Sequence, residues 1–269
     1  MIKAIVTGAG GRMGGRIATL IAETNGIELS GAVEQAGHPF IGKDIGERLG
    51  LGPIGVVIED NLAGCIDRGD VVIDFTSREA STEHLRIAAA KEKAIVIGTT
   101  GFTVDEMKKI RDMAGAVRCV IAPNMSVGVN VLFKVLADVV RILGDDYDVE
   151  IVEAHHHNKK DAPSGTAMKI AEVIAASLGR ELNQVGVYSR RGMIGERTKA
   201  EIGIQTLRGG DIVGDHTVMF AGMGERLEFI HRAHSRDNFA RGAIMAACWV
   251  VSRKNGIYDM QDVLGLRPG

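Results

Sequence analysis

The sequence has few cysteines and no excess of charge of either sign. Cys65, Cys119 and Cys248 are widely separated, odd in number and form no C-x-x-C pair. They predict neither a disulfide framework nor a cysteine zinc site, and they fit a reducing cytoplasm. With 32 basic and 34 acidic residues the formal net charge is −2. This balance disfavours nucleic acid as a partner, because duplex binding usually needs a basic surface.

Long apolar segments are also missing. The longest, Ala243–Val251, is too short to span a bilayer. The N-terminal MIKAIVTGAGG runs straight into a glycine loop and shows no signal-peptide pattern. We therefore expect a cytoplasmic protein with no membrane partner.

Proline is scarce, at 5 residues, whereas glycine is abundant, at 35 of 269. Glycine without proline indicates tight turns and close backbone approaches rather than a low-complexity linker. Hydrophobic residues make up 45% and charged residues 25% of the chain, which is typical of a globular protein and excludes disorder as its main state. The length predicts two domains or one large one.

The first half of the sequence alternates short β-branched runs with longer helical patterns, as parallel sheets do. The expected strands are Ile2–Thr7, Glu28–Glu34, Val71–Phe75, Ala94–Ile97 and Arg118–Ala122. The expected helices are Met13–Thr24, Glu79–Glu92 and Val104–Ala114. Continuous apolar runs within the strands predict a sheet that is covered on both faces.

The pattern changes after Asn124. A helix from Ser126 to about Leu143, a strand over Asp148–Ala154 and a helix over Ser164–Leu178 are expected. The segment from Val187 to His231 is mostly strand-like, and a last helix over about Asn238–Ser252 is expected to pack on the first domain, with no strand after it. We predict an α/β protein: a Rossmann-type parallel-sheet domain over residues 1–126, completed by 236–269 and interrupted by an α+β substrate domain over 127–235.

A glycine-rich loop follows the first expected strand. Gly8, Gly11 and Gly14 are spaced as G-x-x-G-x-x-G, which lets the backbone approach a pyrophosphate at the start of a helix. Glu34 lies 20 residues beyond Gly14, where a carboxylate accepts hydrogen bonds from an adenosine ribose. Because Glu34 repels a 2′-phosphate and Gln35 follows it, the pattern favours NADH. Arg12 can offer compensating charge, so NADPH stays a second candidate.

Two further strand ends carry polar groups. Asp74–Thr76 and Gly98–Gly101 offer hydroxyl and backbone groups that can hold the nicotinamide half of a dinucleotide. Ordinary turns are the alternative interpretation of both segments.

The segment Glu153–Thr166 is the richest in reactive side chains. It holds three histidines and two lysines within six residues, and then a helix start at Ser164–Thr166. Such a start offers backbone N–H groups to a carboxylate. Neighbouring cations lower one another's pKa, which favours a proton-donating histidine or lysine near neutral pH. The expected ligand is a small polar dianion.

Two other interpretations of this segment remain open. His155 and His157 are spaced for one strand face and could bind a metal, but no credible third ligand is visible, and we predict no metal. A solvated polar loop is the other alternative.

With these residues laid out, the sequence resembles the dihydrodipicolinate reductase family over nearly its whole length. The shared motifs are TGAGGRMG at Thr7–Gly14, IDFT at Ile73–Thr76, GTTGF at Gly98–Phe102, NMSVGVN at Asn124–Asn130, EAHHHNKKDAPSGTA at Glu153–Ala167 and GDIVGDHTVMF at Gly210–Phe220.

The resemblance implies a Rossmann-type domain and a mixed-sheet substrate domain through which a homotetramer assembles. It implies reduction of 4-hydroxy-tetrahydrodipicolinate to tetrahydrodipicolinate in diaminopimelate and lysine biosynthesis. Hydride passes from NADH or NADPH to C4 of the ring, and a proton is added at C3.

The resemblance also implies roles for individual residues. His155 would donate or accept a proton, and Lys159 would be the second proton-donating group. The substrate would contact His156, Gly165, Thr166 and Arg236. The cofactor would contact Gly8, Ala9, Gly10, Gly11, Arg12, Met13, Glu34, Gly98, Thr99, Thr100, Ala122, Pro123, Asn124 and Met125, and we add Thr76 from the strand-end pattern. Many relatives carry Arg where Gln35 stands, which strengthens the expectation of NADH.

Two rival functions remain. One is another NAD-dependent oxidoreductase, acting on a small dicarboxylate, an amino acid or a sugar acid. The other is a non-catalytic NADH sensor, which would leave the His/Lys segment without a role.

Overall fold

The computed structural model describes residues 1–267. They form two compact units, one of Met1–Val127 with the described part of Asp237–Gly269, and one of Gly128–Arg236. Each unit has its own sheet and its own hydrophobic core. This is the predicted fold class, a Rossmann-type parallel sheet interrupted by a second domain with a mixed sheet.

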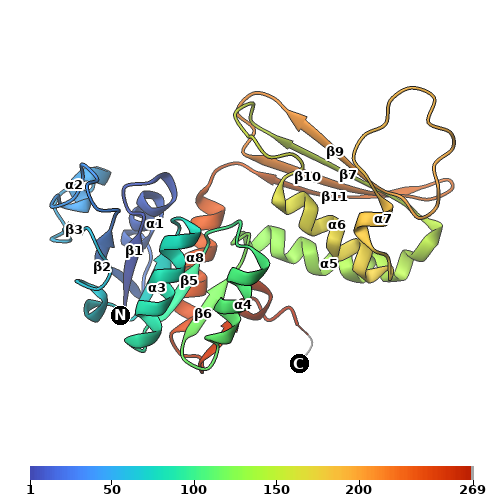
Figure 1. Ribbon diagram of the computed structural model, residues 1–269. Helices are drawn as coiled ribbons and strands as arrows, with labels where there is room; N and C mark the ends of the chain where they lie inside the picture. Colours follow the sequence, from blue (N-terminus) through green and yellow to red (C-terminus); the bar gives the residue numbers. More distant parts are fainter. Residues whose placement is uncertain (268–269) are drawn as a thin grey trace. The chain divides into compact units, whose positions relative to one another are not determined.

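The first unit is built on a seven-stranded parallel sheet in the order β12-β6-β5-β4-β1-β2-β3 (Figure 1). Its strands are β1 Ile2–Thr7, β2 Ile27–Val33, β3 Ile58–Glu59, β4 Val71–Asp74, β5 Ala94–Ile97, β6 Arg118–Ile121 and β12 Gly256–Tyr258. Its helices are α1 Arg12–Ala22, α2 Ile45–Leu49, the 3-10 turn η1 Ile66–Arg68, α3 Arg78–Ala90, α4 Val104–Asp112, α8 Asp237–Val250 and α9 Met260–Val263.

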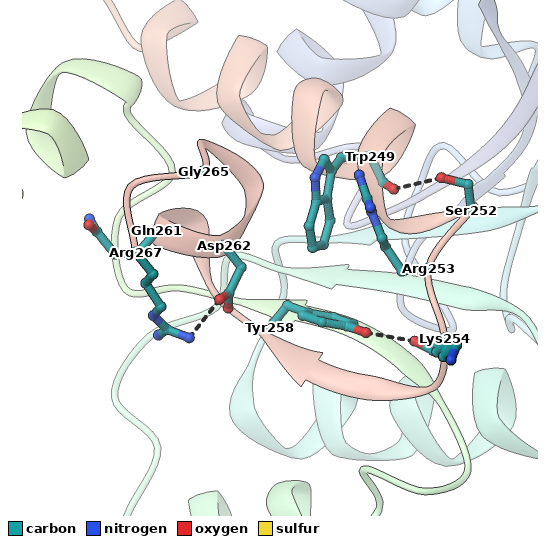
Figure 2. A pocket seen from close by; sticks show the side chains of 9 residues that line it. All are labelled: Trp249, Ser252, Arg253, Lys254, Tyr258, Gln261, Asp262, Gly265 and Arg267. Carbon is teal, nitrogen blue, oxygen red and sulfur yellow. Dashed lines mark hydrogen bonds and ion pairs between the residues drawn. The ribbon is translucent and has the colours of Figure 1, made fainter. Parts of the chain in front are cut away.

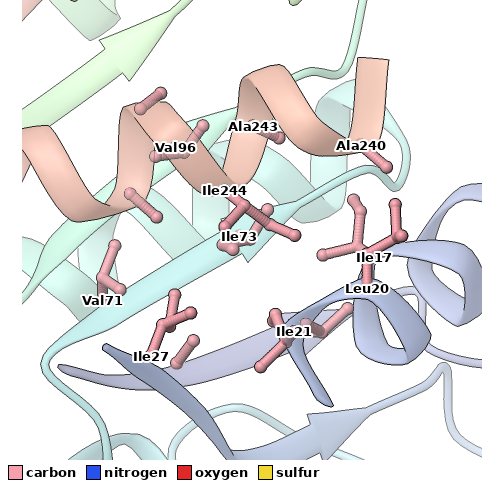
Figure 3. Packing of buried hydrophobic residues seen from close by; sticks show 14 of the residues in the cluster. Ile17, Leu20, Ile21, Ile27, Val71, Ile73, Val96, Ala240, Ala243 and Ile244 are labelled. Atoms are coloured by element: carbon pink, nitrogen blue, oxygen red, sulfur yellow. The ribbon is translucent and has the colours of Figure 1, made fainter. Parts of the chain in front are cut away.

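The strands of this sheet are apolar on both sides because helices cover both faces. On one face, α1 and α8 pack over the sheet, and Figure 3 shows Ile17 and Leu20 of α1 with Ile244 of α8 above Ile73 of β4. Each large aliphatic side chain buried here contributes roughly 1.5–3 kcal/mol to folding. The opposite face buries alternate strand residues against α3, α4 and η1. The helix expected at Asn238–Ser252 is α8, and it packs on this sheet.

The expectation that no strand follows this last helix is wrong. β12 pairs with β6 and adds a parallel edge strand to the sheet, with Gly256 N–H bonded to the carbonyl of Val117 at 2.8 Å. The sequence pattern misses β12 because an edge strand of three residues is too short to show a hydrophobic period. It misses the two-residue β3 at the other edge for the same reason.

The second unit has a five-stranded mixed sheet in the order β11-β10-β7-β9-β8. Its strands are β7 Asp148–His155, β8 Gly186–Val187, β9 Ile202–Arg208, β10 Gly214–Ala221 and β11 Arg226–Ala233. Its helices are α5 Val127–Leu143, the 3-10 turn η2 Gly144–Asp146, α6 Gly165–Ser177 and α7 Leu182–Val185. In Figure 1, α5, α6 and α7 lie along one face of this sheet, and α5 and α6 share a core with β7, β9 and β10.

Within residues 1–267, no helix combines the length and the apolar character needed to cross a lipid bilayer.

Candidate active site

The glycine-rich loop is the turn between β1 and α1. Gly8 has φ +68°, a left-handed conformation that glycine adopts without strain. A Cβ placed on Gly14 would lie 2.1 Å from the carbonyl oxygen of Gly8, so only glycine allows α1 to start this close to β1. The N-cap of α1 is Gly11, which supplies no side-chain cap, and the first turn contains no acidic residue. The first N–H groups of α1 therefore suit an anion such as a pyrophosphate.

A cavity of about 370 Å3 adjoins this turn. It is lined by Gly8, Gly11, Val33, Glu34, Gln35, Asp60, Phe75, Thr76, Ser77, Ala80 and His84. The carboxylate of Glu34 accepts hydrogen bonds from the N–H groups of Gly10, at 2.8 Å, and Gln35, at 2.9 Å. These bonds hold the carboxylate at the cavity, where its remaining lone pairs can accept ribose hydroxyls. The turn and the cavity together fit the adenosine half of a dinucleotide.

Asp74 organises the ends of β4 and β5. Its side chain is fully buried, and Oδ1 accepts the N–H of Thr76 at 3.0 Å and the hydroxyls of Thr76, Ser81 and Thr99 at 2.7–3.3 Å. Its Oδ2 lies 2.6 Å from Nδ1 of His84. This network fixes Thr76 and Thr99, two residues expected from the sequence.

The other expected cofactor residues lie at the same edge of the sheet. Gly98, Thr99 and Thr100 follow β5, and Ala122, Pro123, Asn124 and Met125 follow β6. Because β4, β5 and β6 are neighbouring parallel strands, their carboxyl ends meet at one edge, where open α/β sheets bind ligands. Ala9, Gly10, Arg12 and Met13 belong to the turn and to the start of α1. Of the expected residues, Gly8, Gly11, Glu34 and Thr76 line the cavity.

In the second unit, the candidate residues start on β7. Burial alternates along this strand, and Val149, Ile151, Glu153 and His155 face the buried side. The last two positions of an apolar row are thus taken by an acid and a base. Such side chains are rare in a core unless they are paired.

The buried carboxylate of Glu153 is fully hydrogen-bonded. Oε2 lies 2.6 Å from Nδ1 of His155 and 2.9 Å from Nη1 of Arg208. Oε1 accepts the N–H of Ser164 at 2.9 Å, Nη2 of Arg208 at 2.9 Å and the hydroxyl of Thr206 at 3.2 Å. Burial alone disfavours the charged carboxylate, but the hydrogen bonds from His155, Arg208 and Ser164 outweigh it and lower the pKa of Glu153 to about 2. Glu153 is therefore ionised at neutral pH.

His216 of β10 completes this buried cluster. Its Nε2 lies 3.1 Å from the hydroxyl oxygen of Ser164, and its ring centroid lies 5.3 Å from that of His155 in an edge-to-face arrangement. Burial, followed by the nearby charges of His155 and His231, lowers the pKa of His216 to about 3. His216 is therefore neutral wherever the protein is folded at ordinary pH.

Ser164 also caps α6, because its hydroxyl accepts the N–H of Ala167 at 3.1 Å. The expected substrate residues Gly165 and Thr166 are the first two residues of this helix. The start of α6 is thus held by Glu153 and His216 through Ser164.

The remaining residues of the polar segment lie in the connection between the end of β7 and the start of α6. Desolvation and the charges of Arg236, His155 and Lys159 lower the pKa of His156, so Arg236 is close enough to act on His156. The Nζ of Lys159 forms an ion pair with Asp161 at 2.8 Å. The structure therefore gathers the expected catalytic and substrate residues within the second unit.

A metal site receives no geometric support in this segment. His155 is bonded to Glu153, whereas Nδ1 of His157 lies 3.1 Å from the carbonyl of Gly210. Among the described residues, no group of three or more His, Cys, Asp and Glu side chains is arranged to hold a metal ion.

A larger cavity of about 600 Å3 lies elsewhere in the first unit. Figure 2 shows its lining residues, Trp249, Ser252, Arg253, Lys254, Tyr258, Gln261, Asp262, Gly265 and Arg267. None of the residues expected from the sequence belongs to this lining, so size alone does not identify the functional pocket.

Sequence reasoning missed several residues that organise these sites. Glu153 precedes His155 by two residues on a strand, a spacing that places both on one face and could have revealed the pair. His216 lies in a motif that we used only for the family resemblance. Arg208 and His84 carry no sequence signal, because chain folding alone brings them to Glu153 and Asp74.

Comparisons with known proteins identify the family of this chain. The family model for the N-terminus of dihydrodipicolinate reductase matches residues 2–125, and the model for its C-terminus matches residues 128–264. A 4-hydroxy-tetrahydrodipicolinate reductase of Syntrophus aciditrophicus (strain SB) is 64% identical over 267 residues, covering 99% of this chain and 100% of the relative. One of Syntrophobacter fumaroxidans (strain DSM 10017 / MPOB) is 60% identical over the same length, with the same coverage.

A solved structure leads to the same family. A dipicolinate-bound dihydrodipicolinate reductase from Paenisporosarcina sp. TG-14 matches with a TM-score of 0.76 and 25% identity, covering 97% of this chain and 98% of that one. Neither rival function is favoured by these matches. The chain therefore belongs to the dihydrodipicolinate reductase family of oxidoreductases.

Proposed function

We propose that this chain reduces 4-hydroxy-tetrahydrodipicolinate to tetrahydrodipicolinate in diaminopimelate and lysine biosynthesis, with NADH as the preferred reductant and His155 and Lys159 as proton donors. The family is one of NAD(P)-dependent reductases. The observation that carries the proposal for the residues is the buried pair of Glu153 and His155 beside the start of α6.

We assign cofactor binding to the first unit and substrate binding to the second. The glycine turn, the uncapped start of α1 and the Glu34 cavity support the first assignment. Thr76, the Gly98–Thr100 segment and the Ala122–Met125 segment would hold the rest of the cofactor at the carboxyl edge of the sheet. We further propose a cytoplasmic homotetramer assembled through the second unit.

A small dianion would bind at the start of α6. The first N–H groups of a helix and its positive dipole end attract a carboxylate, and Gly165 and Thr166 occupy this position. His156, Arg236 and Lys159 would add donors and positive charge. Because the start of α6 is already fixed, little free energy is lost to ordering it when the ligand binds.

The chain's own groups would complete the reduction by supplying a proton. A bound nicotinamide cofactor would deliver hydride to C4 of the ring, which leaves an electron-rich intermediate. The cations of the polar segment stabilise the charge that develops, and His155 or Lys159 protonates C3. Because the ionised Glu153 accepts a hydrogen bond from the N–H at Nδ1 of His155, Nε2 is the ring nitrogen left to exchange a proton. Asp161 holds the ammonium group of Lys159 in place.

The proposed preference for NADH rests on Glu34 and Gln35. The carboxylate of Glu34 is held at the cavity by two backbone N–H groups, where it favours ribose hydroxyls and repels a 2′-phosphate. Gln35 supplies no compensating charge, and Arg12 at the start of α1 is the residue through which NADPH would be tolerated.

The proposal is tested by making the substrate in situ from pyruvate and aspartate semialdehyde with a synthase. Oxidation of NADH and NADPH is then followed in parallel over a concentration series. We expect rapid oxidation with the higher kcat/KM for NADH. Faster oxidation of NADPH would refute the cofactor choice alone. No oxidation of either, with NADH still bound, would refute the reductase and support the sensor.

A further inference from the structure

Glu153 lies on the buried face of β7, where the alternation of buried and less buried residues along the strand predicts an apolar side chain. Its side chain is fully buried, and its two oxygens receive five donors from four residues. The guanidinium of Arg208 supplies two of these donors, one to each carboxylate oxygen. Two of its other donors lead directly to the proposed chemistry, Nδ1 of His155 and the N–H of Ser164.

We infer that Glu153 is a positioning residue for the proton transfer: it fixes His155 with the proton on Nδ1, turns Nε2 toward the substrate, and anchors the start of α6 to the same carboxylate. The inference rests on the proposed function, because it assigns Glu153 a role through His155 and Ser164.

The hydrogen-bond pattern sets the tautomer of His155. An ionised carboxylate can only accept a hydrogen bond, so the ring nitrogen 2.6 Å from Oε2 must carry the proton. Nε2 is then the nitrogen that exchanges a proton with a ligand. Gly214 of β10 leaves space beside it, since a Cβ on Gly214 would come within 3.0 Å of Nε2.

The anchor of α6 uses the second oxygen. Oε1 accepts the N–H of Ser164, the N-cap residue of α6, at 2.9 Å. The proposed proton donor, His155, and the proposed carboxylate-binding start of α6 are therefore both held by the carboxylate of Glu153. A displacement of Glu153 would misplace both relative to each other, and proton transfer is sensitive to such errors in geometry.

Charges from every surrounding element act on His155. Glu153 faces it from β7, the neutral His216 from β10, and Arg208 of β9 reaches it through Glu153. His156 and Lys159 add positive charge from the polar segment, and His231 of β11 lies behind His216 with ring centroids 6.3 Å apart. Glu153 is the anion in direct contact with His155, so it is the group whose charge most directly attracts a positive charge on this ring.

The test replaces Glu153 by Gln. The amide keeps the shape but loses the charge and offers one acceptor oxygen to the five donors. We expect kcat to fall by ~100-fold or more. We expect the limb of the kcat–pH profile that reports the proton donor to move to lower pH, and NADH affinity to stay within about threefold. Glu153→Asp keeps the charge and should recover part of kcat and the position of this limb.

The chain provides a matched control in Glu150. It lies on the same strand and accepts two hydrogen bonds from the guanidinium of Arg190, at 2.8 and 2.9 Å, but among residues 1–267 it has no hydrogen bond or ion pair to a histidine. Glu150→Gln should lower kcat by less than about threefold and leave the pH profile in place. A loss of kcat that is equal in E153Q and E150Q, with neither profile moved, would reduce Glu153 to a structural residue and overturn the inference.

A measurement on the unmodified protein covers the case in which E153Q does not fold. Nitrogen-15 NMR of labelled histidine distinguishes the two ring tautomers, and we expect neutral His155 to carry its proton on Nδ1. Protonation on Nε2 instead would overturn the inference. Near-normal turnover by His155→Ala would refute the proposed function of His155 itself, whereas an inactive H155A with an unmoved E153Q profile refutes only the role of Glu153.

Discussion

Lowering the pH should destabilise the second unit through His216, whose side chain is only 4% exposed. Burial lowers the pKa of His216 to about 3 in the folded chain, against 6.5 for an ordinary histidine. In the unfolded chain His216 is therefore protonated below about pH 6.5, whereas in the folded chain it is protonated only below about pH 3. The stabilising effect of a neutral His216 is complete above pH 6.5 and is lost progressively as the pH falls below it.

The size of the effect follows from the width of this window. Each pH unit inside it costs about 1.4 kcal/mol. Between pH 6.5 and pH 5.0, His216 should thus remove about 2 kcal/mol from the free energy of unfolding. His156 and His231 act in the same direction, because desolvation lowers their pKa as well. Glu153 adds a further loss of stability only below about pH 4.5, because its folded-state pKa is lowered to about 2 and its stabilising contribution is lost as the pH falls toward that value.

Comparison of the wild type with His216→Gln isolates the pH-dependent contribution of His216 to the free energy of unfolding. Urea denaturation followed by circular dichroism gives the free energy of unfolding at pH 7.5, 6.5 and 5.0. The variant should be less stable at pH 7.5, because it disturbs the contact with Ser164, but its loss between pH 6.5 and 5.0 should be about 2 kcal/mol smaller. An equal loss in both proteins would refute the conclusion that His216 is held neutral by burial.

Three further predictions concern the proposed activity and the glycine turn. His155→Ala and Lys159→Ala should each lower kcat by roughly 100-fold or more while NADH binding, measured by fluorescence titration, survives. Gln35→Arg should raise the ratio of kcat/KM for NADPH to that for NADH by about tenfold or more, because a guanidinium can pair with the 2′-phosphate. Gly14→Ala should cost about 1–3 kcal/mol or more in urea denaturation and weaken NADH binding, because its Cβ would lie 2.1 Å from the carbonyl oxygen of Gly8.

Each of these predictions has an outcome that contradicts it. Near-normal kcat in both the His155 and Lys159 variants would remove their assigned roles. An unchanged cofactor ratio in Q35R would mean that residue 35 does not face the 2′ position. For Gly14, the matched control is Gly26→Ala, where a Cβ meets nothing within 4 Å although φ is +89°. If both alanine variants bind NADH equally well, the close approach of α1 to β1 has no importance for the cofactor.

The cofactor region of the first unit and the substrate region of the second unit each contain a buried carboxylate paired with a histidine. Asp74 and Glu153 are both fully buried carboxylates at the carboxyl ends of strands, and each lies 2.6 Å from Nδ1 of a histidine, His84 in one unit and His155 in the other. A buried carboxylate that is ringed by donors is rigid, since each lost bond would leave a desolvated polar group. Such carboxylates can hold the loops at strand ends and the imidazole rings of histidines in fixed positions through hydrogen bonds alone.

Much of the first unit was predictable from local pattern. β5 has the expected bounds, Ala94–Ile97, because a continuous apolar run between turn residues leaves few alternatives. The glycine turn and Glu34 were likewise placed by spacing, and the structure puts Gly8, Gly11 and Glu34 on one cavity. β12 was not predicted, because pairing with β6 rather than a sequence period creates it.

Sequence alone determined the residue types and spacings on which family, fold class and candidate residues depend, since periodicity and turn chemistry act over a few neighbouring positions. Tertiary structure alone decided the partners of the buried charges. Arg208 reaches Glu153 across 55 residues because β9 pairs beside β7, and His216 reaches Ser164 because β10 pairs on the other side. Which strand neighbours which depends on how the whole sheet buries its apolar face, so no local pattern could identify the groups that hold His155.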